Sequence, residues 1–322
     1  MGNVRHPRRG SLQYWPRARS SKHAPRVRAW AATKEQKLLG FIGYKAGMTH
    51  LLVKETNPNS PRKNMDVFTP VTVVECPPLR VLSVRYYRYN DDHAASIVTE
   101  VFSKKVEKRL ARKTGHATKA TTPPPTFDVV KIVVYTQPWL TGIGKKKPDV
   151  VELGVGGKTS TEQSAFALSL LDKEVRVTDV VKEFQWVDVH GVTKGKGFSG
   201  VVKKFGVKLL HHKSEKGVRG IGTMGSWHPN RVQFSVPQAG KWGYLLRTEY
   251  NKLTLKVGLK STEINPKGGF VRYGFVKSDY VLLKGSIPGP VKRPITFVDA
   301  IRSQEKVYPG MITYTSLESK QR

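Results

Sequence analysis

The residues of this chain that could bind a ligand gather in one segment, residues 190–260. The segment has fourteen lysines and arginines against two acidic residues, Glu215 and Glu249, and it also contains Trp227 and Trp242. Ammonium and guanidinium groups bind phosphate, and aromatic rings stack on nucleobases. Frequent glycines disfavour a long helix or strand and allow close approach of a ligand to the backbone. This composition predicts a loop that becomes ordered against a polyanion.

The acidic residues are poorly distributed for catalysis. A hydrolytic site requires a nucleophile with a base, or two carboxylates in a pocket. Eight of the 24 acidic residues fall between Asp149 and Asp188, outside the basic segment. Residues 154–159 (GVGGKT) resemble a phosphate-binding loop, but the chain has Glu152 where that motif requires glycine, which favours an ordinary turn. We therefore predict no enzymatic activity, no small-molecule substrate and no cofactor.

Histidine and cysteine give no pattern typical of a metal site. His190, His211, His212 and His228 lie in the basic segment without cysteines or paired carboxylates at zinc-ligand spacing. We expect these histidines to contact RNA or solvent, and no metal to be bound. Cys76 is the one cysteine, so an intramolecular disulfide is excluded and a reduced, cytosolic compartment is expected.

The net charge of +32 implies a persistent anionic partner. Residues 1–37 contribute ten lysines and arginines against Glu35, so this arm and the basic segment together carry most of the net charge. A membrane is disfavoured because no apolar run approaches the ~20 residues that span a bilayer. The arm is either a disordered tail or a segment that orders in RNA. Its aromatic residues Tyr14, Trp15 and Trp30 favour the second interpretation.

The remainder of the chain predicts a mainly β body with an α+β insertion. Short apolar segments between glycines and prolines indicate strands, and we place them at residues 38–49 and 50–54 (joined by a tight turn), 71–76, 79–89, 127–136, 184–192, 269–276, 279–285 and 296–301. Helices are expected at residues 103–114 and 161–171. The predicted organisation is a basic N-terminal extension (1–37), a small β-barrel (38–90 and 180–322) with the embedded basic loop 190–260, and an inserted α+β domain (91–179).

Trp227 has two interpretations of about equal weight. It stands in the sequence Gly-Ser-Trp-His-Pro with basic residues around it, which is typical of a loop tip that wedges into RNA. It could instead pack back on the barrel as an ordinary core aromatic residue.

Several motifs together resemble the universal large-subunit ribosomal protein three family in its archaeal or eukaryotic-type form. They are residues 43–49 (GYKAGMT), 188–200 (DVHGVTKGKGFSG), 225–229 (GSWHP), 238–240 (QAG), 243–244 (GY), 268–270 (GGF) and 284–290 (KGSIPGP). The chain departs from the family at Lys204, where arginine is usual and could pair with phosphate in a bidentate manner. It departs again at Glu215, near a position where eukaryotic members carry histidine.

The resemblance implies a translation-protein-like β-barrel that carries a long basic loop and an extended N-terminal arm. It implies a structural constituent of the large ribosomal subunit in the cytoplasm, a primary rRNA-binding protein near the 3′ end of the large-subunit rRNA that nucleates assembly. The loop around Trp227 would support the peptidyl-transferase region. Expected protein neighbours are ribosomal proteins fourteen and twenty-four-e.

The basic groups are expected to meet phosphates, while glycines such as Gly195, Gly197 and Gly200 let RNA approach the backbone. We expect rRNA contacts from Arg5, Arg8, Arg9, Arg17, Arg19, Arg26, Arg28, Lys45, Lys194, Lys196, Lys203, Lys204, Lys213, Lys216, Arg219, Trp227, His228, Arg231, Lys241, Trp242, Arg247, Lys292 and Arg293. Two rival functions are an RNA-modifying enzyme and a DNA-compacting architectural protein.

Overall fold

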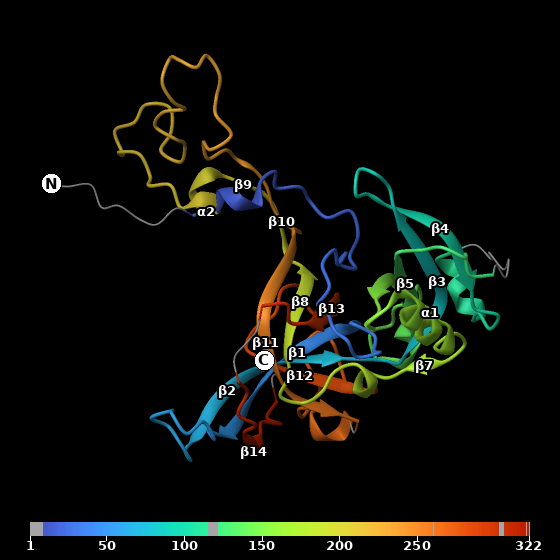
Figure 1. The fold of residues 1–322 in the computed structure, drawn as a ribbon. Coiled ribbons are helices and arrows are strands. Elements are labelled where there is room, and N and C mark those ends of the chain that lie inside the picture. Colours follow the sequence, from blue (N-terminus) through green and yellow to red (C-terminus); the bar gives the residue numbers. More distant parts are fainter. Residues whose placement is uncertain (1–8, 115–121, 260, 303–305, 320, 322) are drawn as a thin grey trace. The chain divides into compact units, whose positions relative to one another are not determined.

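A computed structural model describes residues 9–114, 122–259, 261–302, 306–319 and 321. The chain divides into two compact units. The first, which we call the arm–loop unit, consists of Met1–Ser21 and Thr193–Leu246. The second, which we call the body, consists of Lys22–Val192 and Arg247–Arg322 (Figure 1). The domain boundaries predicted from the sequence stay a prediction.

The larger sheet of the body closes on itself. Its strand order is β13-β8-β11-β12-β2-β1-β14, and β13 also pairs with β1, so the pairings within the described residues return to their start as they do in a barrel. Figure 1 shows these strands gathered around a common core. The strands are β1 (Gly40–Lys54), β2 (Asp66–Glu75), β8 (Trp186–Val192), β11 (Leu246–Gly258), β12 (Tyr280–Lys284), β13 (Pro294–Asp299) and β14 (Met311–Thr315). The expected mainly β fold is confirmed.

Strand β1 corrects one prediction, because Gly40–Lys54 forms one long strand where the sequence predicts two strands with a turn. Its glycines serve close packing. A Cβ at Gly43 would lie 2.7 Å from Val74 Cγ1, and a Cβ at Gly47 would lie 2.6 Å from the Phe270 ring. The register with β2 shifts between Lys45 and Gly47, which lets one strand bend around the barrel without breaking.

A second, antiparallel sheet combines strands of the predicted insertion with residues 79–89, which were predicted as part of the barrel; we call it the insertion sheet. It has the order β4-β3-β5-β6, with β7 also paired to β3. Its strands are β3 (Leu79–Tyr89), β4 (Ala95–Phe102), β5 (Val129–Thr136), β6 (Val150–Gly154) and β7 (Glu174–Val175). Helix α1 (Ser160–Ser169) lies where residues 161–171 predict a helix, and Thr159 caps it by accepting a hydrogen bond from the Glu162 backbone amide.

Three other expectations about elements were wrong. Residues 103–114 contain only a 3₁₀ turn, η2 (Lys108–Arg112), because Leu110 alone gives this charged stretch a buried anchor. Residues 269–276 form a turn closed by the Phe270–Gly274 bridge instead of a strand. The basic segment is not all loop, because its last part is β11. The remaining 3₁₀ turns are η1 (Leu12–Tyr14), η3 (Pro138–Leu140), η4 (Val177–Asp179) and η5 (Ser261–Glu263).

The core of the body runs from the barrel into the insertion sheet. Phe41 and Phe297 stack with their ring centroids 5.9 Å apart, and they belong to one apolar cluster with Leu79 and Ile132 of the second sheet. The barrel and the insertion are therefore joined by shared packing, which supports both sheets as parts of one body.

Trp30 belongs to this packing as well. The ring lies over Gly154, where a Cβ would come within 2.8 Å of it, and it contacts the main apolar cluster. Gly156 donates a backbone hydrogen bond of 2.8 Å to Lys37, so the second half of the predicted arm lies along the end of β6. The expectation that the Trp30 ring stacks in RNA is corrected, because the body already packs it.

Glu75 is a fully buried carboxylate that the body surrounds with donors. It accepts hydrogen bonds from the backbone amides of Lys277 (2.6 Å) and Ser278 (2.9 Å) and from the Tyr273 hydroxyl. Burial, followed by the charge of Glu75, raises the pKa of Tyr273. The pair therefore fixes the 269–276 turn against β2. None of the helices in the described residues is long and apolar enough to cross a membrane.

Candidate nucleic-acid interface

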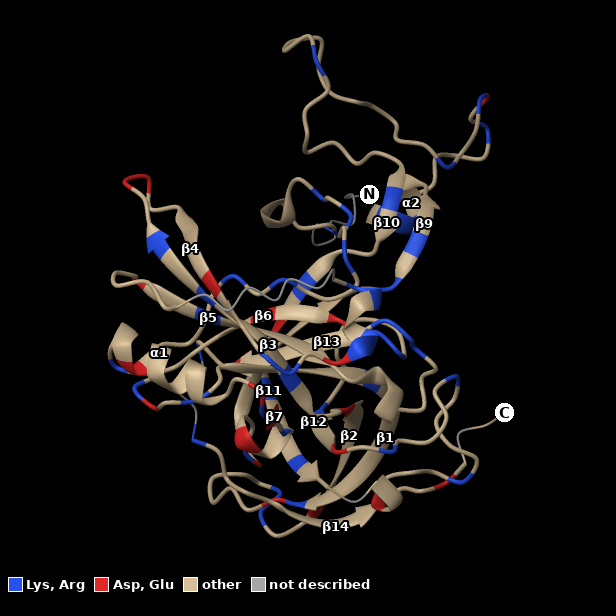
Figure 2. Cartoon of the chain, turned by 90° about the vertical axis from the view of Figure 1, so that its right-hand side faces the viewer, with Lys and Arg blue, Asp and Glu red and all other residues tan. Residues whose placement is uncertain are grey.

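The arm–loop unit is built on a two-stranded ribbon. Strand β9 (Gly195–Ser199) pairs antiparallel with β10 (Gly240–Gly243), and the short helix α2 (Val201–Phe205) follows β9. Figure 2 shows lysine and arginine on both strands. These strands have alternating small and basic residues and little apolar surface, so the ribbon gains stability from what packs beside it.

The N-terminal arm packs on this ribbon. Ser20 donates a backbone hydrogen bond of 2.9 Å to the carbonyl of Tyr244. The Arg17 guanidinium lies 5.1 Å from the centre of the Phe205 ring, and Trp15 contacts Phe234 edge-on with centroids 5.7 Å apart. Cation–π and aromatic contacts of this kind hold a chain with few aliphatic residues. Residues 9–21 are thus an integral part of the unit.

The charge of the unit is almost entirely positive. Its described residues contain thirteen lysines and arginines and a single acidic residue, Glu215. Arg17 has further contacts within the chain. The other twelve cations have no ion pair with a carboxylate in the described part of the chain. In the body, some of the cations have carboxylate partners, such as Arg80 with Glu174 at 2.7 Å. The positive field of the arm–loop unit is therefore available to an external anion.

Two lysines of the unit lie against aromatic rings. Lys196 Nζ lies 3.7 Å from the centre of the Trp242 ring, and Lys204 Nζ lies 5.2 Å from that of Phe205. Partial burial, followed by the charge of Arg17, lowers the pKa of Lys204. A phosphate beside Lys204 would relieve this repulsion, which is a property expected of an anion-binding position.

The loop beyond α2 has no helix or strand between residues 206 and 239. Large apolar side chains there face solvent: Trp227 is 83% exposed and Phe234 is 66% exposed. Of the two interpretations of Trp227, packing on the barrel as a core residue does not occur. The exposed ring remains available for stacking.

The unit brings together most of the basic residues that the sequence predicts as contacts. Arg5 and Arg8 lie outside the described residues. All of the others in the unit are exposed except Arg17, Lys204 and Trp242, which are half-buried. The predicted rRNA contacts that lie in the described part of the arm–loop unit are Arg9, Arg17, Arg19, Lys194, Lys196, Lys203, Lys204, Lys213, Lys216, Arg219, Trp227, His228, Arg231, Lys241 and Trp242.

The remaining predicted contacts lie in the body. Lys45 is buried and donates hydrogen bonds to the carbonyls of Ile287 (2.7 Å) and Gly289 (3.2 Å), so its ammonium group has a structural position inside the barrel. Arg293 is half-buried and donates to the Val192 carbonyl at 3.0 Å. Arg247 is also half-buried, whereas exposed positions are held by Arg26, Arg28 and Lys292.

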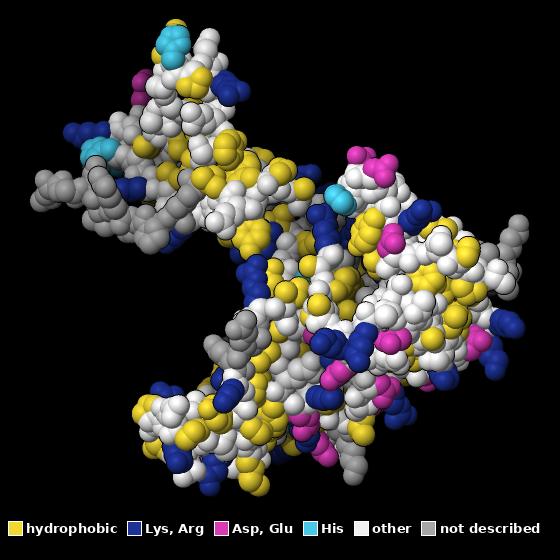
Figure 3. Space-filling view, viewed as in Figure 1, with side chains coloured by type: hydrophobic (Ala, Val, Ile, Leu, Met, Phe, Trp, Pro, Cys, Tyr) yellow, Lys and Arg dark blue, Asp and Glu magenta, His cyan; other side chains and the backbone are white. Residues whose placement is uncertain are grey.

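Two residues of the ribbon were absent from the predicted contacts. Phe198 is 77% exposed on β9, and Tyr244 directly follows β10 with a left-handed backbone (φ 56°). Each is an aromatic residue within three positions of a glycine and a lysine, which is the signal that could have identified them. Acidic side chains, in contrast, occur over the part of the body that holds β3, β4 and β5 (Figure 3).

Comparison with known proteins matches one protein family along nearly the whole chain. The profile of the family described as Ribosomal protein L3 matches residues 1–121 and 125–318. The chain is 43% identical to the large ribosomal subunit protein uL3 of Methanocaldococcus jannaschii, over 99% of this chain and 98% of that protein. It is 44% identical to the protein of the same name from Archaeoglobus fulgidus, over 98% of both chains.

Proposed function

This chain belongs to the ribosomal protein L3 family, in its archaeal type, and on this premise we propose that it is a structural constituent of the large ribosomal subunit. Its relatives are named as ribosomal proteins and not as enzymes, in agreement with the absence of a catalytic pattern in the sequence. We propose that the chain binds large-subunit rRNA through the arm–loop unit.

One observation carries this proposal: the unpaired cations and the exposed aromatic rings occur in the same unit. A solubilising charge would be spread over the surface, and a protein interface would be depleted of lysine. Twelve cations without carboxylate partners beside exposed Trp227, Phe198 and Phe234 match the combination that single-stranded and folded RNA require.

The mechanism that follows is neutralisation of phosphates where rRNA segments converge. Exposed Lys194 and Lys203 meet phosphates, and open glycine positions such as Gly200, where a Cβ would have no neighbour within 4 Å, allow RNA to approach the backbone. Such contacts fix register and orientation and read RNA shape more than base sequence.

The finer parts of the proposal follow from the family. The chain is a primary binder near the 3′ end of the large-subunit rRNA and nucleates assembly in the cytoplasm. The loop that carries Trp227 and His228 supports the peptidyl-transferase region without taking part in chemistry. Ribosomal proteins fourteen and twenty-four-e are the proposed neighbours of the body, whose acid-rich stretch from Asp149 to Asp188 suits a basic protein.

Sedimentation of a cell extract through a sucrose gradient tests the assignment. Stable comigration of the tagged full chain with large subunits is the expected result. A soluble chain that modifies RNA, or a chain in the nucleoid fraction that binds duplex DNA as tightly as rRNA, would support one of the two rival functions. A tagged chain in which residues 220–240 are deleted should still sediment with subunit precursors but impair their function.

A further inference from the structure

We propose that a pocket between the N-terminal arm and the β9–β10 ribbon holds one unstacked nucleotide of RNA. This inference rests on the proposed rRNA-binding function and specifies one of its contacts. The pocket has a volume of about 570 Å³, is open to solvent, and lies wholly within the arm–loop unit. That volume is within the range of ~300 to 1,000 Å³ that small-molecule sites occupy.

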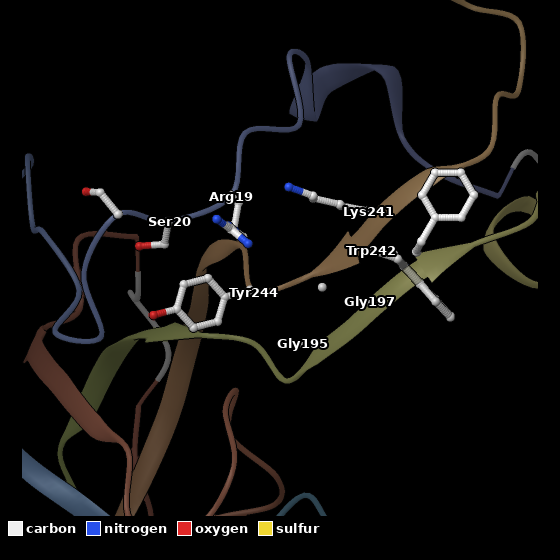
Figure 4. A pocket seen from close by; sticks show the side chains of 10 residues that line it. Arg19, Ser20, Gly195, Gly197, Lys241, Trp242 and Tyr244 are labelled. Atoms are coloured by element: carbon white, nitrogen blue, oxygen red, sulfur yellow. The ribbon is translucent and has the colours of Figure 1, made fainter.

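The pocket combines two groups of complementary chemistry. Arg19 of the arm and Lys241 of β10 supply positive charge, and Trp242 and Tyr244 supply aromatic surface. Figure 4 shows Arg19, Lys241 and Tyr244 reaching into the same space from the arm and from the ribbon. A nucleotide has the matching pair of groups, a phosphate and a flat base, whereas the bases inside a continuous duplex are stacked on one another and offer no free face to an aromatic ring.

Among the described residues, the two cations have no competing partner. Neither Arg19 nor Lys241 has an ion pair or a side-chain hydrogen bond within the part of the chain that the structure describes, and both are exposed. Lys196, by contrast, is already placed on one face of the Trp242 ring. A phosphate entering the pocket would therefore find Arg19 and Lys241 available, and no internal ion pair would have to break.

The backbone that forms the aromatic wall is held in an uncommon conformation. Gly243 (φ 74°) and Tyr244 (φ 56°) are both left-handed, and a Cβ at Gly243 would lie 2.0 Å from the Lys194 carbonyl oxygen. The Tyr244 amide donates to that same carbonyl at 3.2 Å, while its own carbonyl accepts from Ser20. A non-glycine residue at positive φ is costly and is retained when the surroundings fix it. Here the turn sets the Tyr244 ring beside the arm.

Gly195, unlike Gly243, is not required by the fold. Its backbone requires no positive φ, and a Cβ there would meet only Tyr244 Cβ at 3.8 Å, which is ordinary contact. The protein itself therefore has room for a side chain at this position. Gly195 also lines the pocket, so a side chain added there would be tolerated by the fold but would occupy space beside Tyr244 that the proposed nucleotide uses.

The test is chemical probing of rRNA bases in large subunits that contain either the native chain or one of two variants. Tyr244→Ala removes the stacking ring, and Gly195→Val fills the pocket with a residue that suits a strand. Dimethyl sulfate and a carbodiimide are the probes, since both modify unpaired, accessible bases. We expect the same one or two nucleotides to become at least about fivefold more reactive in both variants, the lower end of what one base–aromatic stack contributes to an equilibrium.

Matched controls come from the body. Tyr308→Ala removes an exposed tyrosine and Lys34→Ala an exposed cation outside the pocket, and neither should change those nucleotides. The two pocket variants are read independently, so one that fails to enter subunits leaves the other decisive. Incorporation of both without a newly reactive base, or with diffuse changes over many nucleotides, would overturn the pocket while leaving rRNA binding intact. Absence of the native chain from large subunits would overturn the proposed function itself.

Discussion

Four exposed lysines of the arm–loop unit give a direct test of phosphate neutralisation. Changing them together to glutamine removes four cations that have no carboxylate partner among the described residues and keeps a polar, uncharged side chain at each position. The positions are Lys194, Lys203, Lys213 and Lys216.

The magnitude follows from counterion release. Each neutralised phosphate contributes about 0.7 to 0.9 to the slope of log K against log salt concentration. If about ten of the available cations meet phosphates, the native chain loses roughly three to five orders of magnitude in affinity between 50 and 200 mM salt. The fourfold variant should have a slope smaller in magnitude by about 3, which makes its binding about a thousandfold weaker at 0.1 M salt and nearly unchanged near 1 M.

Fluorescence anisotropy with a labelled fragment from the 3′ part of the large-subunit rRNA measures this slope for the full chain. The matched control neutralises four exposed lysines of the body: Lys104, Lys105, Lys108 and Lys113. Its slope should equal that of the native chain. An equal loss in both variants would mean that net charge alone drives binding. An unchanged slope in the first variant would refute phosphate contact by these lysines.

The remaining predictions concern the body and the loop tip. Trp30→Ala should lower the free energy of unfolding by about 2 to 4 kcal/mol, because the ring packs over Gly154 against the main apolar cluster. Exposed Trp227→Ala should change it by less than about 0.5 kcal/mol, and urea titration measures both. Glu75→Ala should cost about 3 kcal/mol or more and lower the melting temperature, because it leaves the Tyr273 hydroxyl and two backbone amides buried without an acceptor. Burial lowers the pKa of His190, so the unfolded chain binds a proton more readily than the folded one. Stability should therefore be constant above about pH 6.5 and fall as the pH drops below it, by at most ~1.4 kcal/mol per pH unit, and His190→Gln should remove that slope in urea titrations from pH 5 to 8.

Local patterns in the sequence predicted the strands whose partners are near in sequence or whose apolar runs are continuous. Residues 79–89 become β3 with the predicted bounds, and the helix predicted at residues 161–171 overlaps α1 (Ser160–Ser169). The prediction of two strands within residues 38–54 was wrong because glycine is as typical of close packing as it is of a turn. The partner that requires Gly47, the Phe270 ring, lies in a distant part of the chain and gives no signal near Gly47. Long-range packing decides such positions.

The basic segment shows a second limit. The charge of this segment predicted a nucleic-acid interface, but it also led to the prediction of a loop where β11 lies. The apolar residues Leu253, Leu255 and Val257 alternate there as in a half-buried strand. Trp30 and Trp15 have the same setting in sequence, yet Trp30 packs in the body and Trp15 packs in the arm–loop unit. Composition therefore predicted what the segment binds better than it predicted which of its residues remain available for binding.

The pairing of Ser20 with Tyr244 has a consequence for biosynthesis. The arm leaves the translating ribosome first, but the strands on which it packs follow only after most of the body has been made. At ~5 to 20 residues per second, the arm waits for tens of seconds without its partner. During that interval a cationic, unfolded segment is exposed to proteases and to any nucleic acid in the vicinity. In a cell that makes this chain in excess of rRNA, we therefore expect proteolytic cleavage within the arm before cleavage within the body.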